Sequence, residues 1–382
     1  EGGSASGIWT LDQAADYESR GLWPIPVLDA ELYTWGNNGT GQLGDGTTTV
    51  RSSPVQIGAL TTWLKTASGY SHTLATTTDG KLYAWGTNTP YGQLGQGNTT
   101  NYSSPVQVGA LTTWLQVAGG YSHSLAIKTD GTLWSFGRNF RGALGLGDTT
   151  DRSSPVQVGA LTTWSDTSAG AYFSAATKTD GTLWAWGRGS SGELGQGNTT
   201  DYSSPVQVGA LTTWSKVVCG HAHTLATTTD GKLYAWGYGG LGPLGHGNTT
   251  FLSSPVQVGA LTTWSDIAGG NYHSLAIKTD GTLWTWGYNN AGQLGLGNTT
   301  NYSSPVQVGG LTTWSKITGG RTYSAALKTD GTLWTWGQNI YGELGVGSTT
   351  SYSSPVQVGA LTTWRVINKG VTGYVSGGIT KT

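Results

Sequence analysis

One position of an internal repeat holds histidine in four copies and other residues in the remaining ones. The histidines are His72, His123, His223 and His273, and the other occupants are Phe173, Tyr323 and Gly373. Histidine titrates near neutral pH, so such a column has the residue type needed for acid-base catalysis or metal binding. Replacement by aromatic and apolar residues argues against both roles. We predict packing or hydrogen bonding for this column.

A second candidate for chemistry is the run from Cys219 to His223. Cys219, His221 and His223 alternate along one predicted strand, and zinc prefers sulfur and imidazole ligands. Gly220 is expected to break the alternation, and no fourth ligand is near in sequence. The chain also has no nucleophile elbow, phosphate-binding loop or paired-carboxylate spacing. The sequence therefore predicts no enzyme activity, no catalytic residue, no metal site and no cofactor.

The elements that position these residues follow from a Trp-Gly pair that recurs every 50 or 51 residues. Its copies begin at Trp35, Trp85, Phe136, Trp186, Trp236, Trp286 and Trp336. A unit of this length does not bury its own apolar face, so neighbouring units must stack to build a core. The regular tryptophan columns are what such packing requires, and we assign them a structural role.

One copy shows how each unit folds. Alternating apolar residues predict strands at 264–267, 273–278, 282–286 and 305–308. Asp280-Gly281 predicts a hairpin with a type I′ turn, which needs positive φ at both central residues. Pro305 suits a strand start or an outer edge, because no ladder N–H is needed there. No helical period separates the strands.

The predicted fold is therefore all-β, a seven-bladed β-propeller of four-stranded antiparallel blades over residues 31–382. A β-solenoid is the structural rival, but it needs capped ends. Here the first copy starts at Leu32-Tyr33-Thr34-Trp35 without its first two strands, whereas Val366-Ile367 and Tyr374-Val375 follow the last copy. We expect these strands to share one blade, which closes the ring and removes exposed edges.

The run at 283–297, preceded by 269–276, resembles the repeat of the regulator of chromosome condensation family. The match recurs from about residue 31 to 376 and implies the same propeller with a composite closing blade. The founding member is a nucleotide exchange factor that inserts a wedge in one blade, but the uniform spacing here leaves no room for one. The plant photoreceptor of the family carries Gly-Trp-Arg-His-Thr motifs, whereas this chain has Tyr70, Tyr121 and His221 in place of the Trp, so light sensing is not predicted.

Composition excludes several partner classes. Lys and Arg total 19, Asp and Glu total 20, and the net charge is −1 without a basic stripe. Nucleic acid is therefore not an expected partner. No apolar run approaches the roughly 20 residues that span a bilayer, so we expect a soluble protein with no membrane span.

The copies differ from one another in two places, after the paired glycines and after Trp-Gly. In an antiparallel blade both places lie at the same end, so we predict one variable face that recognises a protein or glycan. Its residues are of types that are enriched at interfaces. The predicted binding residues are Tyr70, Tyr91, Tyr121, Arg138, Phe140, Arg141, Tyr172, Arg188, His221, Tyr238, Leu241, Tyr272, Tyr288, Arg321, Ile340 and Tyr341. Neutral drift of surface loops is the alternative.

Residues 1–30 form a separate segment. Thr10 and Gln13 match a capping box, which predicts a short helix ending near Gly21. The segment resembles junctions in phage tail-fibre and virion proteins. The chain starts at Glu1 without Met, so we expect an upstream parent protein or assembly that this segment tethers; a strap packed on the propeller is the alternative.

The first functional hypothesis is a non-enzymatic binding or adhesion propeller displayed outside the cell or on a virion surface. The alternatives are a regulatory propeller for an intracellular partner such as a small GTPase, and a purely structural component of an appendage.

Overall fold

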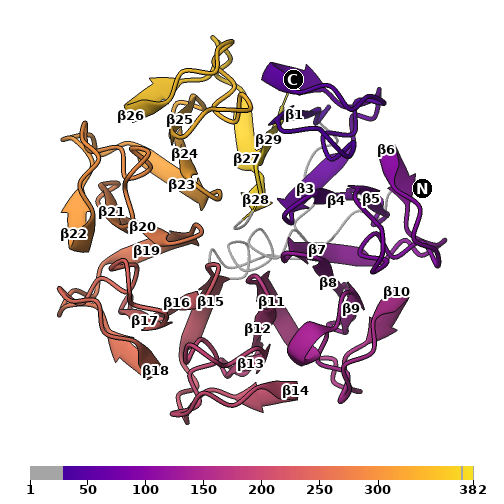
Figure 1. Ribbon diagram of the computed structural model, residues 1–382, viewed down its shortest axis with the longest axis horizontal. Coiled ribbons are helices and arrows are strands. Elements are labelled where there is room, and N and C mark those ends of the chain that lie inside the picture. Colours follow the sequence, from indigo (N-terminus) through magenta and orange to yellow (C-terminus); the bar gives the residue numbers. More distant parts are fainter. Residues whose placement is uncertain (1–28, 371–372, 382) are drawn as a thin grey trace, which may run out of the picture.

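The computed structural model describes residues 29–370 and 373–381, which form a closed ring of seven sheets (Figure 1). The predicted tether and helix fall within residues 1–28, outside the described residues, apart from the last two residues of the segment. In each blade the first strand lies nearest the ring centre and the fourth lies at the rim (Figure 1). The predicted all-β, seven-bladed propeller is confirmed.

Six blades are built from consecutive strands. Blade 1 contains β3 (Trp63–Ser68), β4 (His72–Thr77), β5 (Leu82–Gly86) and β6 (Tyr102–Gln107), and blade 2 contains β7 (Trp114–Gly119), β8 (His123–Lys128), β9 (Leu133–Gly137) and β10 (Arg152–Gln157). Blade 3 contains β11 (Trp164–Ala169), β12 (Phe173–Lys178), β13 (Leu183–Gly187) and β14 (Tyr202–Gln207), and blade 4 contains β15 (Trp214–Cys219), β16 (His223–Thr228), β17 (Leu233–Gly237) and β18 (Leu252–Gln257). Blade 5 contains β19 (Trp264–Gly269), β20 (His273–Lys278), β21 (Leu283–Gly287) and β22 (Tyr302–Gln307), and blade 6 contains β23 (Trp314–Gly319), β24 (Tyr323–Lys328), β25 (Leu333–Gly337) and β26 (Tyr352–Gln357).

The seventh blade is composite. It contains β27 (Trp364–Ile367), β29 (Val375–Thr380), β1 (Leu32–Gly36) and β2 (Arg51–Gln56), in that order from the centre outward. The β1 strand pairs antiparallel with β29 on one side and with β2 on the other. The predicted shared blade is therefore confirmed. A short strand, β28 (Lys369–Gly370), adds to the inner edge of β3, and one 3-10 turn, η1 (Phe140–Gly142), lies in a loop of blade 2.

The Asp-Gly hairpins are present, but the predicted type I′ turn is wrong. Arg141 is the one residue other than glycine with positive φ among the described residues, so the aspartates of these turns have negative φ. In blade 2, Gly131 has a φ of 76°, its N–H bonds the carbonyl of Lys128, and the N–H of Lys128 bonds the carbonyl of Thr132. This is a turn followed by one residue of positive φ, the longer hairpin loop with a glycine bulge. Only the glycine needs the left-handed conformation.

Apolar side chains meet between blades rather than inside one blade. Trp214 and Trp236 of blade 4 pack with Leu183 and Val208 of blade 3 in one buried cluster. Both indoles are at most 3% exposed, and their ring centroids lie 6.0 Å apart. Burial of a large aromatic ring stabilises the fold by several kcal/mol, at about 25 cal/mol per Å². The predicted structural role of the tryptophan columns is confirmed.

Each blade also hydrogen-bonds the next through one loop carbonyl. The carbonyl of Glu193 in blade 3 accepts from Trp236 Nε1 at 3.0 Å and from Thr224 Oγ1 at 2.8 Å, both in blade 4. The same double acceptor occurs between five further pairs of blades, at the carbonyls of Gln42, Ala143, Pro243, Gln293 and Glu343. In blade 2, where Phe136 replaces the tryptophan, the carbonyl of Gln93 accepts from Ser124.

The histidine column completes these junctions. His223 Nε2 lies 3.0 Å from Ser274 Oγ of the next blade, and Ser274 in turn donates to the carbonyl of Pro243. Complete burial lowers the pKa of His223 to about 3, and a nearby His273 adds to this, so the ring is neutral at physiological pH. In blade 6 Tyr323 stands in place of the histidine, and its hydroxyl donates a hydrogen bond to the carbonyl of Val375 in the composite blade. The predicted hydrogen-bonding role is confirmed for the four histidines. The assignment of Gly373 to this column is wrong, because Val375 pairs with Gly36 as His72 pairs with Gly86.

Glycine is required where a loop meets the indole. Gly145 has a φ of 74°, and a Cβ added there would lie 2.7 Å from Trp186 Nε1. Any side chain at this position would therefore displace the ring that seals blade 2 against blade 3.

Deletion of residues 366–382 is predicted to abolish cooperative thermal unfolding. The deletion removes β29, which is the only partner of β1 on its inner side, so the composite blade would lose its centre. Differential scanning calorimetry measures the outcome. As a control, Ser376→Ala removes one hydrogen bond to the carbonyl of Glu343 and should cost about 1 kcal/mol while the transition stays cooperative. A normal transition in the deletion variant would contradict the closure.

Trp236→Phe is predicted to lower the free energy of unfolding by about 1–2 kcal/mol, because the ring stays buried and one hydrogen bond is lost. Phe136 already occupies the equivalent place in blade 2. Trp236→Ala should cost about 3–5 kcal/mol, because it leaves a cavity between blades 3 and 4. Chemical denaturation of both variants measures the two losses, and equal losses would show that the hydrogen bond dominates the junction.

Candidate interaction surface

The loops that vary between copies lie at one end of the ring. They connect the first strand to the second and the third to the fourth in each blade, and we call the surface they form the variable-loop face. Tyr172, in the first type of loop, contacts Phe140, in the second type, with ring centroids 5.2 Å apart. Tyr272 and Tyr238 make the same kind of contact at 5.3 Å. The two types of variable loop thus contact each other, as expected if both lie on one face.

A row of tyrosines crosses four neighbouring blades on this face. Tyr70 of blade 1 stacks on Tyr121 of blade 2, with centroids 4.3 Å apart and an interplanar angle of 15°. Tyr121 continues to Tyr172 of blade 3 at 5.5 Å, and Tyr70 continues to Tyr374 of the composite blade at 6.1 Å. Tyr341 adds to the far end, 5.2 Å from Tyr374. These half-buried rings present a continuous aromatic strip.

Two arginines lie over this row. Arg321 donates from Nη1 to the hydroxyl of Tyr70 at 3.1 Å, and its Cζ lies 4.8 Å from the Tyr374 ring. Arg138 lies 4.5 Å from the ring of Tyr91 and 4.9 Å from that of Phe140. Such contacts are cation–π interactions. No carboxylate of the described residues forms an ion pair with Arg138 or Arg321.

The other two predicted arginines are occupied. Arg141 reaches from blade 2 to Asp201 of blade 3, with Nη1 2.7 Å from the carboxylate, and it holds a φ of 60° that is unusual for a residue with a side chain. Arg188 bonds the buried carboxylate of Glu193 at 2.6 Å. These two positions fix loops rather than offer free charge.

A second, smaller cluster lies on blades 4 and 5. His221 lies 5.4 Å from Tyr272, and Tyr238 lies 4.7 Å from the half-exposed Phe251. Burial lowers the pKa of His221 to about 4, with Arg188 and Arg321 contributing, so it is neutral at physiological pH. Of the remaining predicted residues, Leu241 and Tyr288 are half-buried and Ile340 is 52% exposed. These three lie on the same loops but belong to neither cluster.

Tyr374 and Phe251 were missed as site residues. Tyr374 was assigned to a C-terminal strand, but Val375 pairs with Gly36 as His72 pairs with Gly86, so Tyr374 occupies the place of the variable pair in the composite blade. Phe251 follows the third-to-fourth loop, where its column holds polar residues such as Asn101 and Asp151 in five of the other six copies and Val50 in the first. The large aromatic residue at this position was the signal in the sequence that could have identified Phe251 as a site residue.

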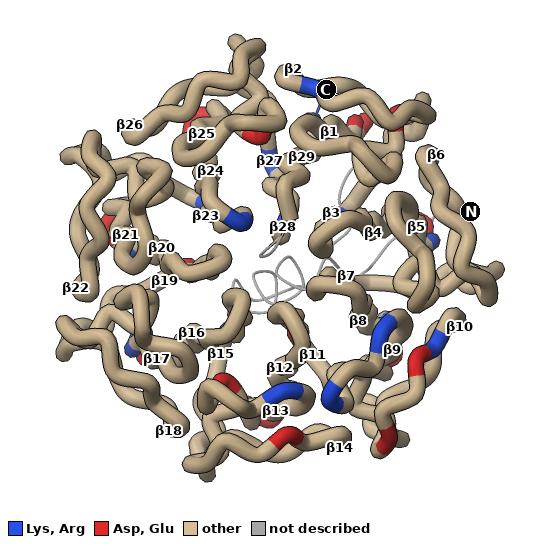
Figure 2. The backbone as a smooth tube through the Cα atoms, viewed as in Figure 1, with Lys and Arg blue, Asp and Glu red and all other residues tan. Residues whose placement is uncertain are grey.

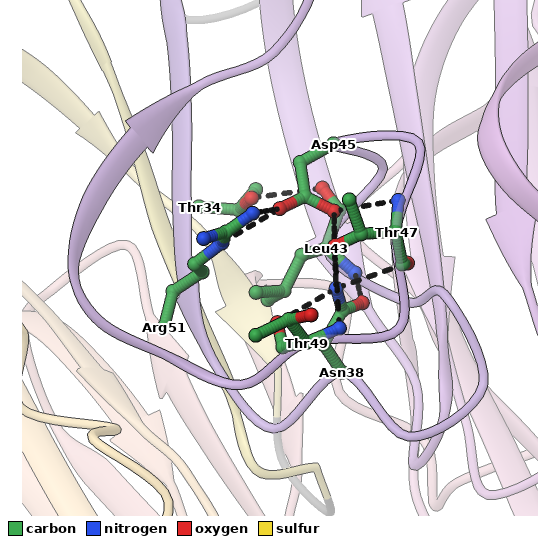
Figure 3. Close-up of polar contacts among 7 residues, drawn as sticks. All are labelled: Thr34, Asn38, Leu43, Asp45, Thr47, Thr49 and Arg51. Atoms are coloured by element: carbon green, nitrogen blue, oxygen red, sulfur yellow. Dashed lines mark hydrogen bonds and ion pairs between the residues drawn. The ribbon is translucent and has the colours of Figure 1, made fainter.

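In five of the seven blades the loop between the third and fourth strands is braced by a buried asparagine, shown for the composite blade in Figure 3. Asn38 Nδ2 donates to the carbonyl of Thr49 at 3.0 Å and to Asp45 Oδ1 at 3.1 Å, and Asn38 Oδ1 accepts from the N–H of Leu43. Arg51 closes the loop on Asp45 at 2.8 Å. The same asparagine recurs at 88, 139, 289 and 339. Preorganised loops lose little conformational entropy on binding.

The candidate zinc ligands do not converge. Cys219 Sγ lies 3.5 Å from the carbonyl of Ser168, and complete burial raises the pKa of the thiol to about 12. His223 is committed to Ser274, and His221 lies in the aromatic cluster on blade 5. Among residues 29–370 and 373–381, no group of three or more His, Cys, Asp or Glu side chains is placed to hold a metal ion.

Charged residues are sparse along the whole ring (Figure 2).

Family models match most of the described chain. Residues 115–381 match the RCC1-like domain, and residues 29–76 and 79–127 match the regulator of chromosome condensation (RCC1) repeat. The chain belongs to the RCC1-like domain family. The resemblance of the repeats to this family is thereby confirmed.

Relatives of this RCC1-like chain match one part of it. The ultraviolet-B receptor UVR8 of Arabidopsis thaliana is 38% identical over 115 residues, which are 29% of this chain and 26% of the receptor. An RCC2 homologue of Danio rerio is 38% identical over 118 residues, which are 30% of this chain and 23% of the homologue. The match thus spans about a quarter of these curated relatives.

Solved structures share the RCC1-like fold over nearly the whole chain. Human WBSCR16 has a TM-score of 0.82 at 22% identity and covers 92% of this chain and 99% of its own. Prp20p from Saccharomyces cerevisiae has a TM-score of 0.82 at 20% identity and covers 96% of this chain and 94% of its own. At these identities the likeness shows the fold alone. No described helix of the RCC1-like chain is both long and apolar enough to cross a membrane.

Sequence reasoning also missed a pair of buried glutamates beneath the face of this RCC1-like propeller. Glu193 and Glu343 occupy the same repeat position, and both are fully buried. Glu193 is paired with Arg188. Glu343 has no charged partner among the described residues, and its Oε1 accepts no hydrogen bond from them. Burial raises the pKa of Glu343 to about 7.

Glu343→Gln is predicted to stabilise the protein at about pH 8 and to change little at about pH 5. The folded pKa lies above the unfolded value of about 4.3, so the penalty for burying the carboxylate grows as pH rises through this interval and is complete above pH 7. The gain at about pH 8 should be roughly 3 kcal/mol, since the pKa rises from 4.5 to about 7. Chemical denaturation at the two pH values measures it.

Glu193→Gln is the matched control. Burial raises the pKa of Glu193 as well, but Arg188 opposes that rise, so the pH-dependent gain between about pH 5 and pH 8 should be smaller than for Glu343→Gln. The substitution also leaves Arg188 half-buried without its carboxylate, which should destabilise the protein at both pH values. A pH-dependent gain as large as that of Glu343→Gln would show that the contrast between the paired and the unpaired glutamate is wrong.

Proposed function

We propose that this RCC1-like propeller is a non-enzymatic module that binds a protein partner through its variable-loop face. The observation that carries the proposal is the tyrosine row from Tyr374 to Tyr172. Arg321 lies over its Tyr374 end, Arg138 lies 5.8 Å from the Tyr172 ring, and no carboxylate of the described residues pairs with either arginine. Tyrosine and arginine are the residues that most often dominate the binding energy of protein interfaces. The rigid loops beneath support such a role.

A regulatory interaction with a protein is favoured over adhesion to a glycan on a virion or cell exterior. Prp20p, which shares the fold, is described with binding properties to Gsp1p and histones. RCC1-like relatives thus offer a precedent for protein partners, whereas none of those reported above supports the predicted virion display. Capture experiments identify the partner protein and the cellular compartment in which that partner is found.

Tyr121→Ala, Tyr172→Ala and Arg321→Ala are each predicted to weaken capture of a protein partner by about tenfold or more, because each removes a central contact of the row. Quantitative affinity purification with cross-linking identifies proteins that bind the wild-type chain and are lost in the variants. Calorimetry checks that melting is unchanged, since all three side chains are half-buried at the surface.

Lys232→Ala is the control on the opposite end of the ring. Lys232 follows the Asp-Gly turn of blade 4, pairs with Asp230 and is exposed to solvent, so its loss should leave capture unchanged. Equal capture by all four variants would refute the proposed surface. Glycan-array binding that disappears in the tyrosine variants would replace the protein partner by a carbohydrate.

A further inference from the structure

The buried side chain that precedes each Leu-Gly pair links the core to the variable-loop face. Its column contains Gln42, Gln93, Ala143, Glu193, Pro243, Gln293 and Glu343. In the two glutamate copies one carboxylate oxygen is bound by the loop itself. The N–H of Ser191 donates to Glu193 Oε2 at 2.6 Å, and the N–H of Tyr341 donates to Glu343 Oε2 at 2.8 Å. Both carboxylates are therefore anchored in the same orientation.

The other oxygen is used differently in the two copies. Glu193 Oε1 accepts from Arg188 Nε at 2.6 Å. The equivalent of Arg188 in blade 6 is Gln338, which instead accepts a hydrogen bond from the hydroxyl of Thr322. Glu343 Oε1 thus accepts no hydrogen bond from the described residues. The equivalent atom in blade 3, Glu193 Oε1, accepts one from the guanidinium of Arg188. A buried carboxylate without a cation is costly, so its retention calls for an explanation.

The surroundings of Glu343 suit an incoming cation. Tyr341, two residues before it, lies edge-on to Tyr374 at 5.2 Å, and both rings belong to the variable-loop face. The charge of Glu343 acts on Tyr374 and on the buried Tyr323. Arg321 lies over Tyr374 but directs its Nη1 to Tyr70, so it does not neutralise Glu343. Aromatic rings next to a carboxylate favour a guanidinium, which stacks and hydrogen-bonds at once.

We propose that Glu343 is the acceptor for an arginine side chain of the protein partner, at the place that Arg188 fills within blade 3. The inference rests on the proposed function, since it names one contact of the same face. Gln338 moves aside and the guanidinium donates to Glu343 Oε1. The partner's arginine thereby pairs with Glu343 as Arg188 of this chain pairs with Glu193.

Binding and ionisation of Glu343 are linked. A guanidinium stabilises the carboxylate, so it lowers the pKa of Glu343, and arginine binding strengthens as pH rises. The titratable or charged groups that face Glu343 are Tyr323, Tyr374 and Tyr341, with Arg321 beyond them. Burial raises the pKa of Tyr323 and of Tyr374 above the usual value of tyrosine, so neither changes charge near neutral pH. A pH dependence in this range therefore reports on Glu343.

The test uses the full chain with ¹³C-labelled glutamate side chains and ethylguanidinium as the probe. NMR titration should show the midpoint of the Glu343 carboxyl falling by about one pH unit in saturating ethylguanidinium and staying in place with neutral ethylurea. The Glu193 signal is the internal control and should not move, because Arg188 already occupies it. An unmoved Glu343 midpoint, or an equal shift of Glu193, overturns the proposal.

Two variants extend the test. Gln338→Arg places an arginine as at position 188 and should remove the response of Glu343 to ethylguanidinium; a response that persists contradicts the assigned place. Glu343→Gln keeps a residue found at Gln42, Gln93 and Gln293 and should weaken partner capture about tenfold. If capture is lost in Tyr121→Ala but kept in Glu343→Gln, the proposed function stands and this inference fails.

Discussion

The ring depends on a loop carbonyl that accepts two hydrogen bonds from the next blade. The carbonyl of Glu193 is the example, with an indole N–H and a threonine hydroxyl of blade 4 as donors. A buried carbonyl needs a partner, and an indole N–H needs an acceptor, so neither group is satisfied unless the blades meet in one register. Apolar contact alone tolerates sliding, whereas this pair of directed bonds does not. In six of the seven junctions the indole thus fills the space between the blades and also fixes their register; the junction of blades 1 and 2 has Phe136 instead.

This constraint separates stability from recognition. The side chain at the Glu193 position varies along the chain while its carbonyl serves the junction, because the bond uses only the backbone. Loops of the variable-loop face can therefore change their side chains without breaking the ring, provided that glycines such as Gly145 keep the indole seated. The buried asparagines hold the loop path in the same way. A rigid scaffold with replaceable side chains is the arrangement that binding propellers need.

Much of the fold was predictable from the sequence because the repeat period and the alternation of apolar residues depend directly on the strand geometry. Period and alternation located the strands of every blade, and the incomplete first copy revealed the composite blade. The type I′ turn was wrong because Asp-Gly fits two hairpin loops, and the difference lies in the φ of Asp130, which composition does not encode. Tyr374 was missed as a site residue because the composite blade has two more residues between its first and second strands than other blades, which shifts the register read from the repeat period.

The contrast between Glu193 and Glu343 also needed coordinates. In sequence the two loops differ by Arg188 against Gln338, which reads as ordinary variation between copies. In space the change removes the only charged partner of a fully buried carboxylate among the described residues. The carbonyl of Glu343 also binds Trp35 and Ser376 at the seam where the two ends of the chain meet. A ligand that neutralises this side chain binds the closed ring and not the unfolded chain, so it stabilises the seam through mass action. The proposed arginine contact would therefore place recognition and ring closure at one residue of blade 6, beside the composite blade.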